Sequence, residues 1–432
     1  MPVLDWPALE PEVRRRVLSR PALEEDGRRA AEVRRILAQV RADGDHALRL
    51  LTRRYDGCEI GELWVAEEEL AAAAAALEPG LRAALERSIA RLVAFHAAQG
   101  REPISLETAP GLRCERILRP LRRVGLYVPA GAAPLPSTLL MLAVPARLAG
   151  CAEIVVATPP GCDGRIDPGI AAAAHLLGLT RVARIGGAQA IAALAYGTES
   201  IPRCDKIFGP GNAWVTEAKR QVAADPEGAA IDLPAGPSEV LVIADASARP
   251  AWVAADLLAQ AEHGPEAQAI ALSPERELLE AVAAEIELQA PRLGRAGTLA
   301  KSLGQLRLVR VAGLEEAFAL ANAYAPEHLI LALAEPRAWL PRVEAAGAVF
   351  LGHWTPEALG DYTSGPNHVL PTYGWARALS GLGLESFQLA ITVQEASPAA
   401  LARVGPDAVR IARAEGLEGH AASILCRLEA RP

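Results

Sequence analysis

Short apolar runs alternate with helical segments along the middle of this chain, and this alternation limits the folds available to it. Each run is followed by a turn rich in glycine or proline and then by a segment with helical periodicity. Strand, turn and helix repeated in this order predict a parallel sheet covered by helices on both faces. The predicted strands lie at 123–128, 153–158, 181–185 and 206–208, and the helices that follow them begin near 138, 169, 190 and 213.

A second series of such units follows a crossing rich in proline and glycine at 231–238, where we place a domain boundary. Its predicted strands lie at 239–244, 268–272, 306–311, 329–333 and 348–351. Helical patterns also fill both ends of the chain, at 8–54, 67–99 and 398–428, with breaks at Gly44-Asp45 and Pro79-Gly80. The expected fold is therefore α/β, with two doubly wound, incomplete Rossmann-like domains, a helical N-terminal arm and a small C-terminal helical tail.

The composition narrows the classes of function. With 51% hydrophobic and 22% charged residues, the 432-residue chain is expected to be globular, and a net charge of −8 argues against a nucleic-acid partner. The six cysteines show no C-x-x-C pair, and no uncharged apolar run approaches the roughly 18 residues of a membrane helix. We expect a soluble cytoplasmic protein without a membrane partner.

Two strand-to-helix turns have the composition of phosphate-binding loops. They are Gly186-Gly187-Ala188-Gln189 and Gly209-Pro210-Gly211-Asn212. Free backbone N–H groups and the helix dipole favour an anion at such a position, which suits a dinucleotide. Neither turn has the full G-x-G-x-x-G pattern, so glycine content alone favours plain tight turns, and Asn212 is equally suited to cap a helix.

The helix predicted to end at Gly264-Pro265 carries an unusual polar stripe. Asp256, Gln260 and His263 follow i, i+4, i+7 spacing on an otherwise apolar helix, so the three side chains project from one side. The stripe fits either a ligand site or local hydrogen bonds with a histidine near the helix C-terminus. The pattern by itself does not decide between them.

Further polar residues lie at the ends of predicted strands of the second domain. Glu327 and His328 lie where a helix ends before Pro326 and a strand begins, and a loop at 360–371 contains Asp361 and His368. Five of the eight histidines come after residue 260. Imidazole, carboxylate and amide ligands together indicate a zinc site, although no H-E-x-x-H motif is present.

The chain resembles the histidinol dehydrogenase family over nearly its whole length. The segments that carry the resemblance are Val124-Gly-Leu-Tyr127-Val-Pro, Pro136-Ser-Thr-Leu-Leu-Met, Ile185-Gly-Gly-Ala-Gln189-Ala-Ile-Ala-Ala-Leu-Ala-Tyr-Gly, Phe208-Gly-Pro-Gly-Asn212, Pro234-Ala-Gly-Pro-Ser238-Glu-Val-Leu, Gln260-Ala-Glu-His263-Gly-Pro, Ala325-Pro-Glu327-His328-Leu and Gly360-Asp361-Tyr through His368-Val-Leu-Pro-Thr. The resemblance implies oxidation of L-histidinol through L-histidinal to L-histidine with two NAD⁺, by a homodimer with one zinc per active site.

The resemblance also implies a role for individual residues. The catalytic pair would be Glu327 and His328, and the NAD site would include Tyr127, Gln189 and Asn212. Zinc would be held by Gln260, His263, Asp361 and His420. The substrate would be contacted by these four residues and by Ser238, His328, His368 and Glu415.

The resemblance divides the chain into an N-terminal helical arm at 1–25, a zinc and catalytic domain at 26–126 and 238–376, an NAD domain at 127–237 and a dimerisation tail at 377–432. It is not complete: Ala130 replaces the first glycine of a usual Pro-Gly-Gly, Leu142 replaces an asparagine, and 383–394 also departs from the family. The first two differences could alter cofactor contacts.

Other functions remain open on the residues alone. A related zinc and NAD dehydrogenase could act on another small alcohol, although Ser238, Glu415 and His420 argue against it. A zinc hydrolase could use Glu327 to activate water, but the two glycine-rich turns would then have no purpose. A metal-stabilised scaffold leaves the polar loops unexplained, and a thiol mechanism lacks a cysteine in any of these motifs.

Overall fold

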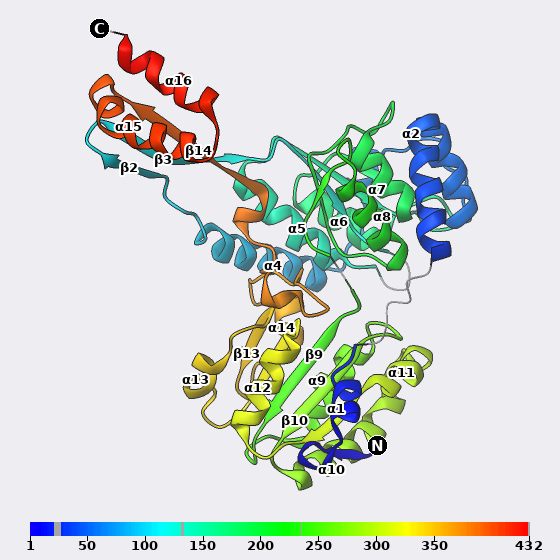
Figure 1. The fold of residues 1–432 in the computed structure, drawn as a ribbon. Coiled ribbons are helices and arrows are strands. Elements are labelled where there is room, and N and C mark those ends of the chain that lie inside the picture. Colours follow the sequence, from blue (N-terminus) through cyan, green and yellow to red (C-terminus); the bar gives the residue numbers. More distant parts are fainter. Residues whose placement is uncertain (21–26, 131–133, 235, 431–432) are drawn as a thin grey trace.

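The computed structural model describes residues 1–20, 27–130, 134–234 and 236–430. Within these ranges the chain forms two α/β bodies, one above the other in Figure 1, and an extension that leaves them at one side. Both bodies contain a parallel sheet with helices on both faces, which confirms the expected α/β class. No helix in these ranges is long and apolar enough to cross a lipid bilayer.

The first body is built on a five-stranded sheet in the order β6-β5-β4-β7-β8. The strands are β4 (Arg123–Tyr127), β5 (Glu153–Thr158), β6 (Val182–Arg184), β7 (Lys206–Phe208) and β8 (Ala230–Ile231). One face packs on α5 (Pro136–Ala149) and α6 (Pro168–Leu176), and the other packs on α7 (Gly187–Tyr196) and α8 (Ala213–Ala224). Alternate strand residues enter the two cores: Val124 and Leu126 face α5, whereas Tyr127 lies in the α7 core.

The second body is built on a six-stranded sheet in the order β1-β11-β10-β9-β12-β13, all parallel. The strands are β1 (Val3–Asp5), β9 (Glu239–Ala244), β10 (Gln268–Ser273), β11 (Arg307–Arg310), β12 (His328–Ala332) and β13 (Ala348–Leu351). Apart from residues at their ends, the central strands β9, β10 and β12 are apolar because helices cover both faces. These helices are α1 (Pro11–Val17), α9 (Pro250–Ala261), α10 (Arg276–Gln289), α11 (Ala296–Ser302) and α12 (Leu314–Tyr324), and the short α13 (Pro336–Trp339) and α14 (Glu357–Tyr362) follow.

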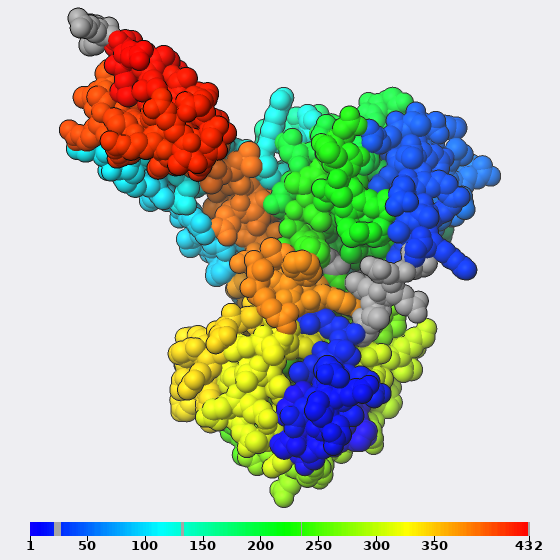
Figure 2. Space-filling model, in the orientation of Figure 1, coloured from blue at the N-terminus to red at the C-terminus, as the bar shows by residue number. Residues whose placement is uncertain are grey.

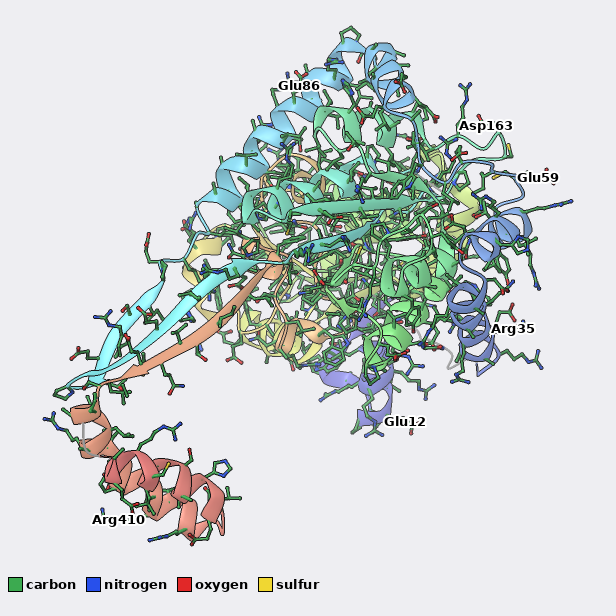
Figure 3. The ribbon with its side chains drawn as sticks, turned by 90° about the horizontal axis from the view of Figure 1, so that it is seen from above. Glu12, Arg35, Glu59, Glu86, Asp163 and Arg410 are labelled. Atoms are coloured by element: carbon green, nitrogen blue, oxygen red, sulfur yellow. The ribbon has the colours of Figure 1, made fainter. Side chains whose placement is uncertain are left out.

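The extension is an antiparallel sheet that carries two helices away from both bodies (Figures 2 and 3). Its strands are β2 (Ile104–Ala109), β3 (Leu112–Pro120) and β14 (Gln388–Ala396), in the order β14-β3-β2. The helices α15 (Pro398–Ala414) and α16 (Glu418–Glu429) pack on each other through a small cluster around Val409 and Ala421. The helical tail is confirmed, but the sequence did not predict the strands that carry it.

The packing corrects two expected boundaries. Residues 26–126 were expected to join the second body, but α2 (Gly27–Tyr55) packs on α7 and α8 of the first. The helices α3 (Glu67–Ala76) and α4 (Pro79–Ala97) likewise pack on α6 and α5. Helical periodicity identifies an apolar stripe but does not indicate which sheet the stripe covers. The N-terminal arm is also not wholly helical, because β1 adds an edge strand beside β11; residues 21–25 of the arm lie outside the described residues.

The predicted break at Gly44-Asp45 is present as a kink inside α2. Gly44 has φ 51° and ψ −129°, a conformation that only glycine adopts without strain. A methyl group at Gly44 would lie 2.1 Å from an oxygen of Glu199, whose carboxylate accepts the backbone N–H of Asp45 at 2.7 Å. The kink therefore holds α2 to the loop after α7.

Gly44→Ala is expected to destabilise the first body by about 1–3 kcal/mol, because alanine at this φ and ψ is strained. The loss would be measured as a lower midpoint of thermal unfolding. Gly27→Ala is the matched control, since a methyl group at the start of the same helix meets no atom within 4 Å. An equal effect of the two substitutions would contradict this role of the kink.

Candidate functional site

A cleft of about 1130 Å³ lies between the two bodies. The first body contributes Pro129 and the 210–213 turn to its lining, and the second contributes Ser238, His263 and Tyr373. The wall from the first body consists of turns that follow parallel strands, the usual ligand position in open α/β sheets, whereas Ser238 and His263 in the second wall precede β9 and β10. The cleft therefore brings the 210–213 turn and His263, one of the expected metal ligands, to one space.

A buried ion pair fixes the backbone of the 209–212 turn. Lys219 on α8 pairs with Asp232, and both are almost fully buried. The ammonium of Lys219 also donates to the carbonyl of Gly209 at 2.8 Å, while Asp232 accepts the N–H of Gly209 at 2.7 Å. Asn212 caps α8 by accepting the N–H groups of Trp214 and Val215, as its sequence position allowed. The turn is thus preorganised, with Asn212 at the cleft.

The other two expected cofactor residues lie deeper in the first body. The hydroxyl of Tyr127 accepts the N–H of Gly187 at 3.2 Å, and the amide of Gln189 donates to Asp56 at 3.4 Å. Burial raises the pKa of Asp56 to about 6. Tyr127 and Gln189 are both buried and do not line the cleft as Asn212 does. Both side chains lie inside the first body, where they support the 186–189 turn.

On the second body, three potential metal ligands converge. Atoms of His263, Glu357 and Asp361 lie within 4.8 Å of one another, and Nε2 of His263 is 3.9 Å from a carboxylate oxygen of Asp361. Glu357 and Asp361 are four residues apart on α14, so both carboxylates project from one side of the helix. Asp361 thus belongs to a helical turn rather than to the expected loop.

Gln260 lies on α9 beside this group and is fully buried. Neither its amide nitrogen nor its oxygen has a hydrogen-bond partner among the described residues. Such an orphaned amide is costly unless something outside the chain binds it. Because oxygen, imidazole and carboxylate donors suit zinc, the donor set present here fits the expected metal.

Glu357 was missed by the sequence analysis, which began the polar loop at Gly360. Its second carboxylate oxygen is also buried without a partner in the described part of the chain. Burial, with repulsion from Asp361, Glu327 and Asp256, holds the pKa of Glu357 well above its usual range. The i, i+4 spacing between Glu357 and Asp361 was the available signal.

Glu327 and His328 lie at the joint before β12, and both are buried. Nδ1 of His328 lies 3.6 Å from carboxylate oxygens of both Glu327 and Glu357, and its Nε2 lies 3.9 Å from Asp361. Burial lowers the pKa of His328 to about 3 and raises the pKa of Glu327 well above its ordinary value. Nδ1 of His328 also donates to the carbonyl oxygen of Glu239 at 3.2 Å, which leaves Nε2 free to accept a proton.

His368 links the two bodies at the back of this group. Its Nδ1 donates to the carbonyl of Asp361 at 2.9 Å, and its Nε2 lies 3.3 Å from the hydroxyl of Thr138 on α5. Thr138 was not expected at the site. Its position shows that α5 reaches the side of the second body where His263, Glu357 and Asp361 converge.

Glu415 and His420, both expected at the site, are also not brought to the cleft within one chain. Glu415 caps the end of α15 and His420 lies in the first turn of α16, both exposed, and these two helices stand away from both bodies (Figure 1). Of the departures from the family, Leu142 is fully buried in the core of the first body, Ala130 is partly buried beside that core, and Gly131 lies outside the described residues.

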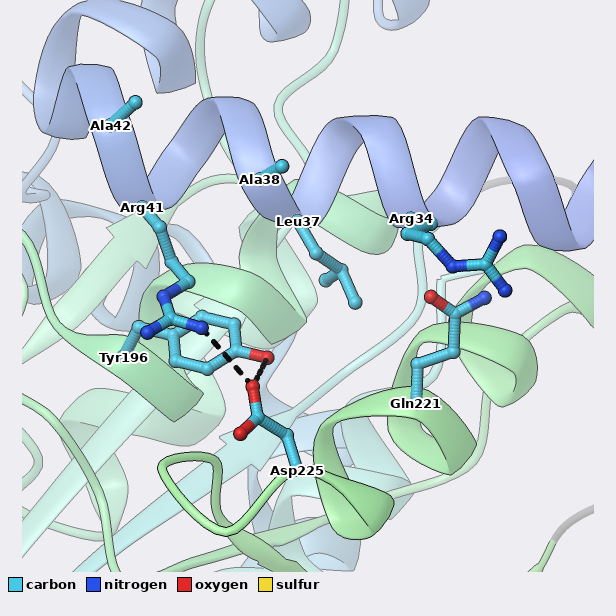
Figure 4. A pocket seen from close by; sticks show the side chains of 8 residues that line it. All are labelled: Arg34, Leu37, Ala38, Arg41, Ala42, Tyr196, Gln221 and Asp225. Atoms are coloured by element: carbon cyan, nitrogen blue, oxygen red, sulfur yellow. Dashed lines mark hydrogen bonds and ion pairs between the residues drawn. The ribbon is translucent and has the colours of Figure 1, made fainter.

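A second hollow, of about 490 Å³, lies on the outer side of the first body, between α2 and α8 (Figure 4). Its polar groups satisfy one another: Asp225 accepts from the hydroxyl of Tyr196 at 3.0 Å and pairs with Arg41 at 3.2 Å. Arg41 also lies over the ring of Tyr196. This hollow contains none of the expected site residues.

Comparison with known proteins identifies the family. A sequence model described as "Histidinol dehydrogenase" matches residues 18–428. Histidinol dehydrogenase of Xanthomonas euvesicatoria pv. vesicatoria is 56% identical over 99% of each chain, and that of Photobacterium profundum is 47% identical over 99% of this chain and 96% of its own. The crystal structure of histidinol dehydrogenase from Elizabethkingia anophelis superposes with a TM-score of 0.93 at 40% identity, covering 98% of this chain and 96% of its own. This chain belongs to the histidinol dehydrogenase family.

Proposed function

We propose that this protein is an NAD-dependent oxidoreductase that converts L-histidinol through L-histidinal to L-histidine, with zinc in the cleft and two NAD⁺ reduced per substrate. Family membership supports the reaction class. The observation that carries the proposal is the cleft itself, because Asn212 and its preorganised turn line it from the first body while Ser238 and His263 line it from the second. A cofactor and a small substrate could meet there.

The proposed metal ligands are Gln260, His263 and Asp361, with His420 completing the set. A zinc ion bound there would hold the substrate's nitrogen atoms and polarise its reacting oxygen. The orphaned amide of Gln260 supports this assignment, since a metal ion would satisfy its oxygen. Glu357 is close enough to act on the same group, as a ligand or as a hydrogen-bond acceptor.

His328 is the proposed base. Its Nδ1–H points at the carbonyl oxygen of Glu239, so the unprotonated Nε2 is directed toward Asp361 and the proposed substrate position. In the first oxidation, the alcohol proton passes to Nε2 of His328 while hydride leaves the carbon for NAD⁺. Because Nδ1 carries the proton, Nε2 of the neutral imidazole has the free electron pair that a base requires.

Glu327 is proposed to act in the second oxidation. Water must add to the aldehyde to give a geminal diol, whose carbon then delivers hydride to the second NAD⁺. Burial and the neighbouring Glu239 and Asp361 raise the pKa of Glu327, and a carboxylate with raised pKa is a stronger base for removing a proton from water. Ser238 lines the cleft and His368 lies behind Asp361, where both are proposed to orient the substrate.

The zinc site is proposed to be shared between two subunits. His420 and Glu415 are exposed on an extension that stands away from the chain's own cleft (Figure 3). The apolar side chains of Leu389, Ile391 and Ile411 are exposed on the same extension and would be covered by a partner. In a two-fold dimer each tail would complete the other's site.

Purified protein is expected to form NADH from L-histidinol, with two NADH per L-histidine at completion. Removing the metal with a chelator should abolish activity, and adding zinc should restore it. His263→Asn should lose zinc as measured by elemental analysis. The control, His353→Asn, removes a histidine whose contact is Ser247 and should keep its zinc. Full activity after complete metal removal would contradict the zinc assignment.

Glu327→Gln is expected to slow the formation of L-histidine from L-histidinal by about 10²–10⁴-fold, because glutamine cannot remove a proton from water. Binding of L-histidinol, measured by calorimetry, should change far less. Glu335→Gln, at an exposed glutamate on the same body, provides the control. Equal turnover of L-histidinal by Glu327→Gln and the unmodified protein would rule out this role.

His263→Asn and His420→Asn should each be nearly inactive alone. After co-refolding, about half of the dimers should be mixed, and each mixed dimer should regain one intact site because both lesions fall in the other. Recovery to about a quarter of the full activity is therefore expected. A site formed within one chain would leave a lesion in every site, so mixed dimers without recovered activity would refute sharing.

A further inference from the structure

The backbone of Glu239 contacts both members of the proposed catalytic pair. Its N–H donates to Oε2 of Glu327 at 2.9 Å, and its carbonyl accepts from Nδ1 of His328 at 3.2 Å. Glu239 is the first residue of β9, the strand beside β12. A small rotation of this peptide segment would therefore displace the side chains of both Glu327 and His328. It would also break the hydrogen bond that fixes the proton on Nδ1 of His328.

The side chain of Glu239 is held by a residue far away in the sequence. Arg20 binds its carboxylate with two parallel hydrogen bonds, Nε to Oε2 at 2.6 Å and Nη2 to Oε1 at 2.8 Å. The hydroxyl of Tyr324 donates to the same carboxylate at 2.9 Å. Because the Glu239 side chain is only 2% exposed, loss of Arg20 would leave a buried carboxylate without its cation.

Arg20 also holds the segment that leads into the catalytic pair. Its Nη2 donates to the carbonyl of Tyr324 at 2.7 Å and lies 3.4 Å from that of Ala325, and the guanidinium stacks 3.9 Å from the ring of Tyr324. Ala325 has φ 53°, in the left-handed region, and the chain then passes through Pro326 to Glu327. Arg20 thus fixes a strained turn as well as β9.

The N-terminal segment is anchored independently of this contact. The amide of Gln268 donates to the carbonyl of Ser19 at 3.1 Å, and Arg310 pairs with Asp5 at 3.0 Å beside β1. Arg20 is therefore presented from a segment that is already part of the second body. Its guanidinium is the cation that pairs with the buried carboxylate of Glu239.

We propose that Arg20 is a positioning residue for the reaction: its two-pronged ion pair with Glu239 fixes the peptide that orients Glu327 and holds His328 as the Nδ1–H tautomer. The expected effect of Arg20 on kcat rests on the proposed function. Its effect on the orientation of Glu327 and on the tautomer of His328 does not. Lysine cannot replace Arg20 fully, since an ammonium lacks the planar fork that binds both carboxylate oxygens and two carbonyl groups.

The test compares Arg20→Lys and Arg20→Gln with Arg310→Gln, which removes one of the two ion pairs at Asp5 and leaves the contact with Glu239 intact. We expect kcat to fall about tenfold in Arg20→Lys and about a hundredfold or more in Arg20→Gln, as happens when catalytic groups are misplaced. KM for L-histidinol and for NAD⁺ should change less than about threefold. Arg310→Gln should keep its kcat. If Arg20→Gln does not fold, Arg20→Lys carries the test.

The second readout does not depend on turnover. In protein labelled with ¹⁵N-histidine, two-bond ¹H–¹⁵N correlation spectra report the tautomer of His328, assigned by its disappearance in His328→Asn. The unmodified protein and Arg310→Gln should show the Nδ1–H form, and the Arg20 variants should show a mixture. An unchanged tautomer in the Arg20 variants, or a fall in kcat matched by Arg310→Gln, would overturn the proposal. If L-histidinol is not oxidised at all, the proposed function fails while the spectra still decide the role of Arg20.

Discussion

Burial of several carboxylates at one end of the second sheet is the constraint on which the rest of the site depends. Glu239 is neutralised by Arg20, whereas the ion pairs of Glu327, Glu357 and Asp361 in the described part of the chain are with histidines only. Burial, and then repulsion among these carboxylates, raises the pKa of Glu327 and of Glu357. A divalent cation beside Asp361 would reduce this penalty, which supports the proposed metal site.

The two sheets have different tasks in this arrangement. The first presents a turn whose backbone is held by the Lys219–Asp232 pair and can face a cofactor without rearrangement. The second presents ionisable groups from β12, α9 and α14, on three separate elements whose positions are fixed by the sheet. His368 and Thr138 join the two bodies behind the site, which couples the cleft walls to each other. Preorganisation of this kind lowers the cost of orienting two ligands.

The sequence predicted the parts of the fold that have strong local patterns. The continuous apolar run at 239–244 is found as β9, and the glycine break at 44 is found as a kink. The antiparallel strands were missed although Ile104-Ser-Leu-Glu alternates apolar and polar residues, because the run is short and its pairing joins 112–120 to the distant segment 388–396. The grouping of α2 with the first body depends on packing between segments that are distant in the sequence, and local periodicity contains no information on it.

The residues of the candidate site likewise differ in how far the sequence alone could identify them. Turns and spacing singled out Glu327, His328, Gln260, His263 and Asp361 as unusual polar residues, and the resemblance to the family gave them roles. The structure brings Glu327, His328, His263 and Asp361 together. Arg20 was not identifiable, because 219 residues separate it from Glu239 and nothing in its surroundings suggests a site. The residue type of His420 fits a metal ligand, but a single chain does not bring α16, which contains it, to the cleft.

A crystal structure of the zinc-loaded dimer with L-histidinol, with anomalous diffraction measured at the zinc edge, would test the central claim most directly. We expect one anomalous peak per cleft, about 2.0–2.2 Å from ligand atoms of Gln260, His263 and Asp361, with His420 contributed by the other subunit. A peak elsewhere, or a cleft occupied by substrate without metal, would contradict the account.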